Sequence, residues 1–405
     1  MRDDDRTVIV GGGLGGLRTA ERLRRRGHRG PVTLLAAEPH LPYDRPPLSK
    51  AALTAEQEPE GPPLLKDRDA CAGLDLDVRT GVRATALDTA HRRIVLDGGG
   101  TLGYDRLVIA TGVRPRELPA LAGLEGVHTL RTWDDCLRLR AGLRAARTVA
   151  VVGGGVLGCE IAAAARTLGL EVTLIELAEQ PLAAVLGGRI GGIVADLHRA
   201  GGVKVRCGAR VERAVRSGVV LDDGSHVDAD LVVAAAGSVP NTEWLAGSGL
   251  VLDDGVLCDR TGRAEGAEDV FAVGDVARMP HPYREGTVRF EHWTSAGDGA
   301  ALVARNLLAP PGERAAPSEV PYFWTDQYDT KIQCLGLPDP GDEPALAAGS
   351  PESGRLLAFY SRDGRVTGGV AFGMPAALAR CRKAIAERVP LADLLGSAPW
   401  ERRSL

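Results

Sequence analysis

With 405 residues the chain is long for one domain, and a typical size of roughly 150 residues per domain predicts two or three domains. A hydrophobic content of 44%, a charged content of 25% and a net charge of -4 are typical of a globular protein and argue against nucleic-acid binding, which usually needs a basic surface. The acidic segment Met1–Arg6 runs straight into a strand-like stretch and no apolar run reaches transmembrane length, so we expect no signal peptide, no membrane contact and a cytoplasmic protein.

The first predicted elements are a strand, a glycine-rich turn and a helix. Residues 7–10 form a short β-branched run, and after it Gly11, Gly13 and Gly16 give the spacing G-x-G-x-x-G before a helix that Gly27 can end. A second strand over 32–35 leads to Glu38. In such a motif the glycines allow a tight turn, close approach of a pyrophosphate and close helix packing, and the acid can accept hydrogen bonds from a ribose diol.

The same pattern returns in the second third of the chain. A strand over 148–152 precedes Gly153, Gly155 and Gly158, a helix follows that ends at Gly169, and a strand over 172–175 leads to Glu176. One glycine motif alone is weak, since many glycine-rich turns resemble it, but two copies with strand, helix and acid in place predict two dinucleotide-binding domains.

The repeat continues beyond the two motifs. A strand over 94–97 leads to a buried strand that ends in the small residues Ala110, Thr111 and Gly112, and a strand over 219–222 leads to its counterpart, which ends at Gly237. Both read as a hairpin followed by a buried strand, and the small residues at its end let a nucleotide or a domain crossover come close.

The seven cysteines are scattered, without a C-x-x-C pair or metal-ligand spacing: Cys71, Cys136, Cys159, Cys207, Cys258, Cys334 and Cys381. We expect reduced, mostly buried thiols and no metal site.

Two such domains followed by Val270–Ala277, which contains Gly274 and Asp275, resemble the flavoprotein disulfide-reductase superfamily. The resemblance implies a bound FAD, with the Asp275 carboxylate on the ribityl chain and Gly274 allowing close backbone approach. On the residues alone, a Gly-Asp pair at a strand end could equally be a helix cap.

Four stretches resemble one branch of that superfamily, the NADH-dependent ferredoxin reductases of the rubredoxin and putidaredoxin type that serve bacterial oxygenases. They are Tyr43–Lys50, His128–Asp135, Glu291–Trp293 and Val320–Gln327. No cysteine pair stands where the disulfide reductases carry theirs. Ser295 and Asp298 depart from the usual pattern of the branch, which leaves the identity of the partner open.

The resemblance also implies individual site residues. Lys50 would reach the reactive central ring of the flavin with Glu160 as its partner, Arg45 would lie near the FAD pyrophosphate, and Trp293 beside the flavin edge. Leu14, Val82, Arg131 and His292 complete the expected cofactor contacts. Simpler interpretations are a solvated surface lysine for Lys50, a first-turn acid that complements the helix dipole for Glu160, and a core tryptophan at a domain junction for Trp293.

The expected architecture is α/β, with two Rossmann-like domains and a C-terminal α/β domain. We place an FAD domain over 1–112 and 238–315, an NADH domain over 113–237 and a partner-docking domain over 316–405. The expected function is electron transfer from NADH through FAD to a two-iron, two-sulfur ferredoxin that serves an oxygenase, by a monomer or weak dimer. Alternatives are a rubredoxin, nitrite or small-quinone reductase, or a redox-sensing binding protein similar to the apoptosis-inducing factors.

Two further expectations concern charge. Glu176 stands where a 2'-phosphate would sit, and the five residues after it contain no arginine, so we expect NADH rather than NADPH. Residues 354–405 contain nine Lys or Arg and four acids, a balance of 9 − 4 = +5 in a chain of net charge -4. A basic segment of this kind predicts docking of an acidic ferredoxin, although a solvated helix face would explain the charges as well.

Overall fold

The computed structural model describes residues 5–124 and 126–401 of the chain. These residues form two compact units. Unit 1 consists of residues 5–44, Gly61–Arg114 and Val239–Glu319, and unit 2 of Arg45–Glu60, Pro115–Ser238 and residues 320–401. The division into an FAD domain, an NADH domain over 113–237 and a docking domain over 316–405 stays a prediction.

The centre of unit 1 is a five-stranded parallel sheet in the order β19-β7-β1-β2-β3. Its strands are β1 (Thr7–Val10), β2 (Val32–Ala36), β3 (Leu76–Thr80), β7 (Arg106–Ile109) and β19 (Val270–Ala272). All residues of β1 and β2 are buried, because helices and strands cover both faces of a parallel sheet and favour continuous apolar runs.

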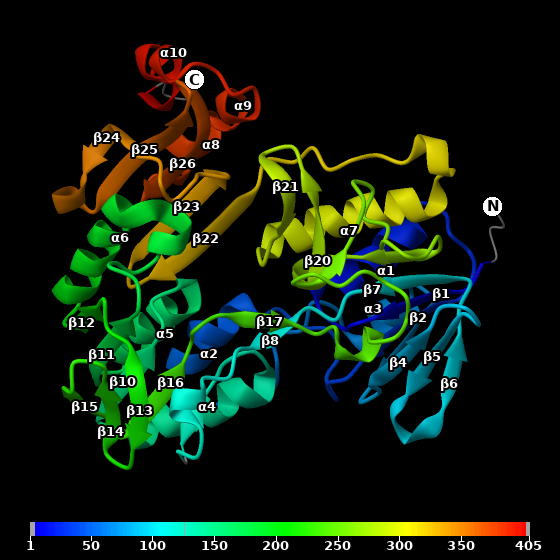
Figure 1. Cartoon of the computed structure of the whole chain (residues 1–405), viewed down its shortest axis with the longest axis horizontal. Coiled ribbons are helices and arrows are strands. Elements are labelled where there is room, and N and C mark those ends of the chain that lie inside the picture. Colours follow the sequence, from blue (N-terminus) through cyan, green and yellow to red (C-terminus); the bar gives the residue numbers. More distant parts are fainter. Residues whose placement is uncertain (1–4, 125, 402–405) are drawn as a thin grey trace. The chain divides into compact units, whose positions relative to one another are not determined.

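Two helices cover one face of this sheet and pack against each other, α1 (Leu14–Arg25) and α7 (Trp293–Leu308) (Figure 1). Leu17 and Leu23 of α1 share a buried cluster with Val303 and Leu307 of α7. A second cluster includes Leu87 and Ile94 of a small antiparallel sheet of β4 (Ala84–Asp88), β5 (Arg93–Leu96) and β6 (Thr101–Gly103).

The rest of unit 1 is made of short elements: α3 (Arg68–Ala72), η2 (Asp97–Gly99), η4 (Glu243–Leu245), β18 (Val256–Leu257), η5 (Gly274–Val276), β20 (Ala277–His281), β21 (Arg284–Arg289) and η6 (Pro311–Glu313). The strands β8 (Val113–Pro115) and β17 (Ser238–Pro240) lie where the chain passes from one unit to the other.

Unit 2 contains a second five-stranded parallel sheet, in the order β12-β11-β10-β16-β9. Its strands are β9 (Val127–His128), β10 (Thr148–Val152), β11 (Glu171–Glu176), β12 (Lys204–Cys207) and β16 (Leu231–Ala234). Strands β10, β11, β12 and β16 correspond in order to β1, β2, β3 and β7 of unit 1, but the edge strand β9 precedes them in the chain, whereas β19 follows its sheet partners. The three-stranded sheet of β13 (Val211–Val215), β14 (Gly218–Leu221) and β15 (His226–Asp228) stands in the chain between β12 and β16, as β4 to β6 stand between β3 and β7. The repeated dinucleotide fold predicted from the sequence is confirmed.

The helices of this part of unit 2 are α4 (Trp133–Ala145), α5 (Val156–Thr167) and α6 (Ala183–Ala200), with the short turns η1 (Pro46–Ser49), α2 (Ala51–Thr54) and η3 (Pro119–Leu121). Thr132 and Asp135 form a capping box at the start of α4, which satisfies backbone N–H groups that the helix leaves unpaired.

The C-terminal part of unit 2 is a five-stranded sheet in the order β22-β23-β26-β25-β24, antiparallel throughout. Its strands are β22 (Tyr322–Gln327), β23 (Thr330–Gly336), β24 (Ala345–Ser350), β25 (Arg355–Arg362) and β26 (Arg365–Phe372). The short elements η7 (Pro351–Ser353), α8 (Pro375–Arg380), α9 (Arg382–Ala386), α10 (Leu391–Ser397) and η8 (Pro399–Glu401) complete it. No helix among the described residues is long and apolar enough to cross a membrane.

Candidate functional site: two nucleotide cradles and a buried ion pair

The first glycine loop joins β1 to α1, and its three glycines serve different purposes. A Cβ atom on Gly11 would lie 2.0 Å from the carbonyl oxygen of Ala110, and one on Gly16 would lie 2.0 Å from the carbonyl oxygen of Gly11. A Cβ on Gly13, the residue before α1, would meet nothing within 4 Å. The fold therefore requires Gly11 and Gly16, while Gly13 stands beside open space at the N-terminus of the helix that begins at Leu14, where unpaired N–H groups favour an anion.

The second glycine loop, between β10 and α5, has the same division. A Cβ on Gly153 would lie 2.4 Å from the Ala235 carbonyl oxygen and one on Gly158 would lie 1.8 Å from that of Gly153, whereas Gly155 has nothing within 4 Å. Both loops thus keep free the position at which a pyrophosphate approaches in this kind of fold. We call each of these loops a cradle, Gly11–Gly16 in unit 1 and Gly153–Gly158 in unit 2. The first fits an FAD and the second a nicotinamide dinucleotide.

The acids predicted after the second strand of each repeat are held in place by neighbours. In unit 1 the Tyr43 hydroxyl donates to Glu38 Oε2 at 2.5 Å. In unit 2 the Glu176 carboxylate accepts from the N–H groups of Gly154 at 2.5 Å and Ala178 at 2.7 Å. Glu176 therefore also fixes the glycine loop, which orients its carboxylate at the edge where a ribose would bind.

Four further predicted site residues of unit 1 follow the carboxyl ends of its strands β3 and β7. The Val82 N–H donates to the Ala36 carbonyl at 2.9 Å, and the Ala110 N–H donates to the Val10 carbonyl at 2.8 Å. The Thr111 hydroxyl donates to the Asn241 carbonyl at 2.8 Å, and Gly112 adopts φ +62 and accepts from the Asn241 N–H at 3.0 Å. In an open parallel sheet, ligands bind outside these strand ends.

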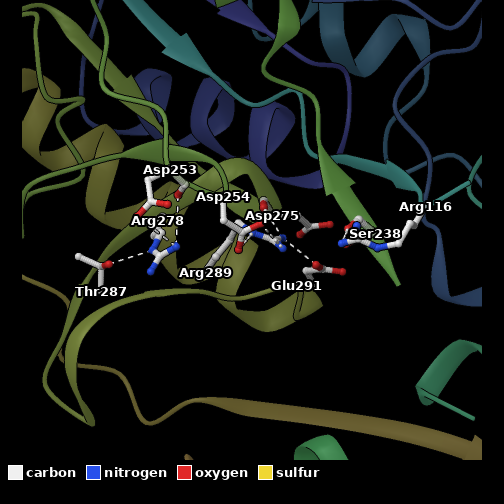
Figure 2. A network of polar contacts seen from close by, with 9 residues as sticks. All are labelled: Arg116, Ser238, Asp253, Asp254, Asp275, Arg278, Thr287, Arg289 and Glu291. Atoms are coloured by element: carbon white, nitrogen blue, oxygen red, sulfur yellow. Dashed lines mark hydrogen bonds and ion pairs between the residues drawn. The ribbon is translucent and has the colours of Figure 1, made fainter. Parts of the chain in front are cut away.

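The Gly274–Asp275 turn is fixed by an arginine that the sequence reasoning missed. Arg289 donates from Nη1 to the Asp275 carbonyl at 3.0 Å and to Glu291 at 2.6 Å, and it pairs with Asp254 at 3.3 Å (Figure 2). Its side chain is 11% exposed. Gly274 has φ +74 and begins the short helix η5 together with Asp275. The N-cap of η5 is Val273 and makes no side-chain cap hydrogen bond, so the interpretation of the Gly-Asp pair as a helix cap is wrong.

The start of α7 carries His292 and Trp293. Burial lowers the pKa of His292 to about 4, a shift that the charges of Asp275 and Glu291 only partly offset, so the imidazole is neutral at pH 7. The Trp293 indole N–H donates to Asp44 Oδ1 at 2.7 Å, and the residue is 38% exposed. A tryptophan this exposed does not fit the interpretation as a core residue.

Lys50 and Glu160 form an ion pair in unit 2, with 2.7 Å between Nζ and Oε2. The Lys50 side chain is 23% exposed and that of Glu160 is 5% exposed, so Lys50 is not a freely solvated surface lysine. Glu160 is the fifth residue of α5 and lies outside its first turn, which corrects the interpretation as a first-turn acid. Its carboxylate also accepts from the hydroxyls of Ser49 at 2.5 Å and Thr325 at 2.8 Å.

The segment that carries Lys50 is anchored to other parts of unit 2. Arg45 donates to the Arg131 carbonyl, and the Arg131 N–H donates to Asp135 at 3.0 Å. The buried Arg140 of α4 donates to carbonyls of Ala52, Leu53, Ala55 and Gln57 at 2.6 to 3.0 Å. Ala52 and Leu53 belong to the last turn of the short helix α2, whose final carbonyls have no intrahelical partners, and Ala55 and Gln57 follow the helix.

Sequence reasoning missed Arg140, Ser49 and Thr325, because their partners lie far away in the chain. A signal existed only for Thr325. Along β22 the residues alternate between partly buried and buried, and Thr325 and Gln327 are polar residues on the buried side. A polar side chain at an inward position of a strand indicates a buried partner.

The predicted site residues fall into two sets. Unit 1 holds those of the first glycine loop, with Glu38, Val82, Ala110, Thr111, Gly112, Gly274, Asp275, His292 and Trp293. Unit 2 holds those of the second glycine loop, with Arg45, Lys50, Arg131, Glu160, Glu176 and Gly237. Within unit 2, Gly237 adopts φ +92 and its carbonyl accepts from the Arg116 N–H at 3.0 Å. The Arg116 side chain donates to the Ser238 carbonyl at 3.1 Å (Figure 2).

The cysteines form no disulfide in the described parts, 5–124 and 126–401. All seven are free, and six of them are buried. Burial raises the pKa of Cys136 and of Cys381 to about 11, so these thiols stay protonated at neutral pH. The same residues contain no group of His, Cys, Asp and Glu that could hold a metal ion.

One chain with two open dinucleotide-binding loops can hold two nucleotide cofactors, which is typical of an oxidoreductase that passes electrons between them. The comparisons with known proteins agree with this class. A model of the family described as pyridine nucleotide-disulphide oxidoreductase matches residues 5–300, and one described as reductase C-terminal matches residues 322–395.

Similar proteins cover nearly the whole chain. The ferredoxin reductase component of chlorobenzene dioxygenase from Cupriavidus sp. (strain PS12) is 40% identical, over 96% of this chain and 96% of that protein. Putidaredoxin reductase from Pseudomonas putida is 32% identical, over 98% of this chain and 95% of that protein. The crystal structure of the covalent putidaredoxin reductase-putidaredoxin complex matches with a TM-score of 0.89 at 32% identity, over 97% of this chain and 95% of that chain.

The chain belongs to the pyridine nucleotide-disulphide oxidoreductase family. It is an oxidoreductase that uses FAD and NAD, and the resemblance to the ferredoxin reductases seen in the sequence is confirmed. The roles of the individual site residues remain proposals.

The glycine geometry makes a paired prediction. In Gly13→Ala the new methyl group fits the fold but intrudes on the pyrophosphate, so the variant should fold and lose FAD affinity by about tenfold or more. In Gly16→Ala the methyl group meets the Gly11 carbonyl, so the variant should lose about 2 kcal/mol or more of unfolding free energy. Denaturant unfolding and flavin titration separate the two effects.

The second loop offers a matched control for the same idea. Gly155→Ala should leave FAD content unchanged and weaken nicotinamide binding, while Gly158→Ala should resemble Gly16→Ala. If Gly13→Ala binds FAD as tightly as the unchanged protein, the open space beside Gly13 is not the pyrophosphate position.

Proposed function

We propose that the chain transfers electrons from NADH through FAD to a two-iron, two-sulfur ferredoxin that serves an oxygenase. The observation that carries the proposal is the pair of open glycine cradles in a chain whose cysteines form no disulfide among the described residues. Without a disulfide among these residues, electrons would leave from the flavin itself. Relatives whose names include ferredoxin reductase support the choice of acceptor.

In this electron transfer the residues of the two cradles would bind the two nucleotides, and the residues around Lys50 and Trp293 would act on the flavin. The first cradle, Glu38 and Asp275 would hold FAD, which when bound accepts a hydride and releases electrons singly. The second cradle and Glu176 would hold NADH. Lys50 would place a positive charge near the flavin ring, and Glu160 would hold the ammonium in position. Trp293 would limit the access of water.

Steady-state reduction of cytochrome c tests the function directly. We expect NADH-dependent reduction to be slow with the reductase alone and to rise strongly when a two-iron, two-sulfur ferredoxin is added. A rate that ferredoxin leaves unchanged, with fast turnover of a small quinone, nitrite or a rubredoxin instead, would assign the acceptor to one of those classes.

Replacing Lys50 tests the proposed cation. Lys50→Met should slow flavin reduction by NADH or lower the flavin potential, because the positive charge that favours reduced, anionic flavin is lost. The fold should persist, since the hydroxyls of Ser49 and Thr325 still donate to Glu160. Stopped-flow reduction and a spectroelectrochemical titration give the two quantities.

A matched control exists in unit 1. Lys66 pairs with Glu21 at 3.2 Å, with side-chain exposures of 21% and 3%, close to those of the Lys50–Glu160 pair. Lys66→Met should cost similar stability and leave flavin reduction unchanged. If Lys50→Met and the unchanged protein show the same rate of flavin reduction and the same flavin potential, Lys50 does not have the proposed role.

The geometry of Glu176 predicts NADH over NADPH. A 2'-phosphate about 4 Å from this carboxylate would cost about 1 to 4 kcal/mol at effective dielectric constants between ~80 and ~20. That is roughly 5- to 1000-fold in affinity. Comparison of kcat/KM for the two nucleotides checks the prediction, and equal or higher efficiency with NADPH would show that Glu176 does not select against the phosphate.

We further propose that the ferredoxin docks on the basic C-terminal segment, and the ion pairs there limit which cations are available. Arg362 pairs with Asp339 at 2.8 Å and with Asp342 at 3.1 Å. Arg380 ends α8 and donates to the Trp400 carbonyl at 3.0 Å, while Lys383 lies in α9. The helix is interrupted between α8 and α9, so Arg380 does not share a helix face with Lys383 and Glu387, which pair with each other along α9.

Lys383 is 84% exposed and 3.7 Å from Glu387, a pair that solvent screens strongly. Reversal of Arg380 and Lys383 to Glu should raise the KM for ferredoxin several-fold at low salt, weaken its salt dependence and leave flavin reduction unchanged, because charge steers association over about 8 to 10 Å. Lys204→Glu, on an exposed lysine of β12, is the control and should change none of these. If ferredoxin turnover depends neither on salt nor on the reversal of Arg380 and Lys383, the ferredoxin docks on another surface.

A further inference from the structure

Unit 2 contains a chain of hydrogen-bonded polar side chains, and Glu160 lies at one end of it. The chain continues through Thr325 and Gln327 of β22 to His198 of α6, and each of these three has no exposed surface. It ends at Tyr328, in the turn between β22 and β23. Buried polar groups must find partners within the protein, so a continuous chain of this kind is a specific arrangement.

The contacts along the chain are all of hydrogen-bond length. The Thr325 hydroxyl donates to Glu160 Oε1 at 2.8 Å, and Gln327 Nε2 donates to the Thr325 hydroxyl at 3.4 Å. Gln327 Oε1 lies 3.1 Å from His198 Nε2. His198 Nδ1 lies 3.1 Å from the Tyr328 hydroxyl.

The protonation states of His198 and Tyr328 decide which group donates in each hydrogen bond of the chain. Burial lowers the pKa of His198 to about 4, so the imidazole carries a single proton at pH 7. An amide oxygen only accepts, so that proton lies on Nε2 and Nδ1 accepts from Tyr328. Burial raises the pKa of Tyr328 to about 12, so its hydroxyl keeps the proton that it donates. Each donor in the chain therefore points towards the Glu160 carboxylate.

The backbone keeps the far end of the chain in place. Tyr328 has φ +54, a left-handed conformation that costs strain for a bulky residue and persists where its surroundings determine it. A Cβ on Gly201, at the end of α6, would lie 2.5 Å from the Tyr328 ring. Glycine at 201 thus makes the room in which Tyr328 reaches His198.

We propose that Thr325, Gln327 and His198 are positioning residues for Lys50, acting through Glu160. Their aligned donors hold the carboxylate, and the carboxylate holds the Lys50 ammonium. The C-terminal sheet would then help to set the charge that acts on the flavin, in addition to any docking role. The inference rests on the proposed function of Lys50 for its consequence and not for the contacts themselves.

The first measurement is the reactivity of Lys50 in the protein as purified. Thr325→Val keeps the shape of the side chain and removes the donor to Glu160, while Thr325→Ser keeps the hydroxyl. We expect Thr325→Val to raise the rate of Lys50 acylation by acetic anhydride about threefold or more. The Glu160 carboxylate loses the hydrogen bond that holds it in place, so it holds the Lys50 ammonium less firmly. Thr325→Ser should stay close to the unchanged protein. Peptide mass spectrometry reads the rate, with Lys204 as the internal reference.

The second measurement is the flavin potential. Thr325→Val should shift it in the same direction as Lys50→Met and by less, and His198→Leu, at the far end of the chain, should give a smaller shift of the same sign. In a Glu160→Gln background Thr325→Val should add nothing. His198→Leu also serves as the test variant if Thr325→Val does not fold.

The outcomes separate the inference from the function on which it rests. Faster Lys50 acylation with an unchanged potential would support the positioning and contradict the proposed role of Lys50 at the flavin. Lys50 acylation that stays unchanged in Thr325→Val and His198→Leu would overturn the inference. So would equal effects of Thr325→Val and Thr325→Ser, since packing and not the hydroxyl would then be responsible.

Discussion

The buried carboxylate of Glu160 is the constraint on which the organisation of unit 2 depends. A carboxylate that is 5% exposed is costly unless charges and donors surround it. Its donors come from the segment with Ser49 and Lys50 and from β22 with Thr325, while Glu160 itself belongs to α5. Three parts of the chain that are far apart in sequence must therefore meet at one point, and that point fixes the lysine proposed to act on the flavin.

The two nucleotide cradles show how one local geometry serves two ligands. Gly11 and Gly153 each approach the carbonyl of the residue that follows a neighbouring strand, and Gly13 and Gly155 each stand in open space. In the proposed function this shared geometry would supply the pyrophosphate site and no more. What distinguishes the cradles lies outside the loops, in the arginine-fixed turn at Asp275 in unit 1 and in the carboxylate of Glu176 in unit 2.

Local patterns in the sequence were sufficient for the repeated fold. The strands predicted over 7–10 and 148–152 have those bounds in the structure, because β-branched runs next to glycine turns need no distant partner to be recognised. The pairing of Lys50 with Glu160 came from family resemblance, since nothing local connects residues 110 positions apart. Arg140 and Thr325 were missed for the same reason, and the break between α8 and α9 has no glycine or proline to announce it.

Anaerobic titration of the flavin-loaded protein with NADH, followed by addition of a two-iron, two-sulfur ferredoxin, tests the central claim most directly. The account predicts that NADH bleaches the flavin absorbance in stoichiometric amount and that oxidised ferredoxin restores it in successive one-electron steps. A flavin that NADH leaves oxidised, or a reduced flavin that ferredoxin does not reoxidise, would contradict it.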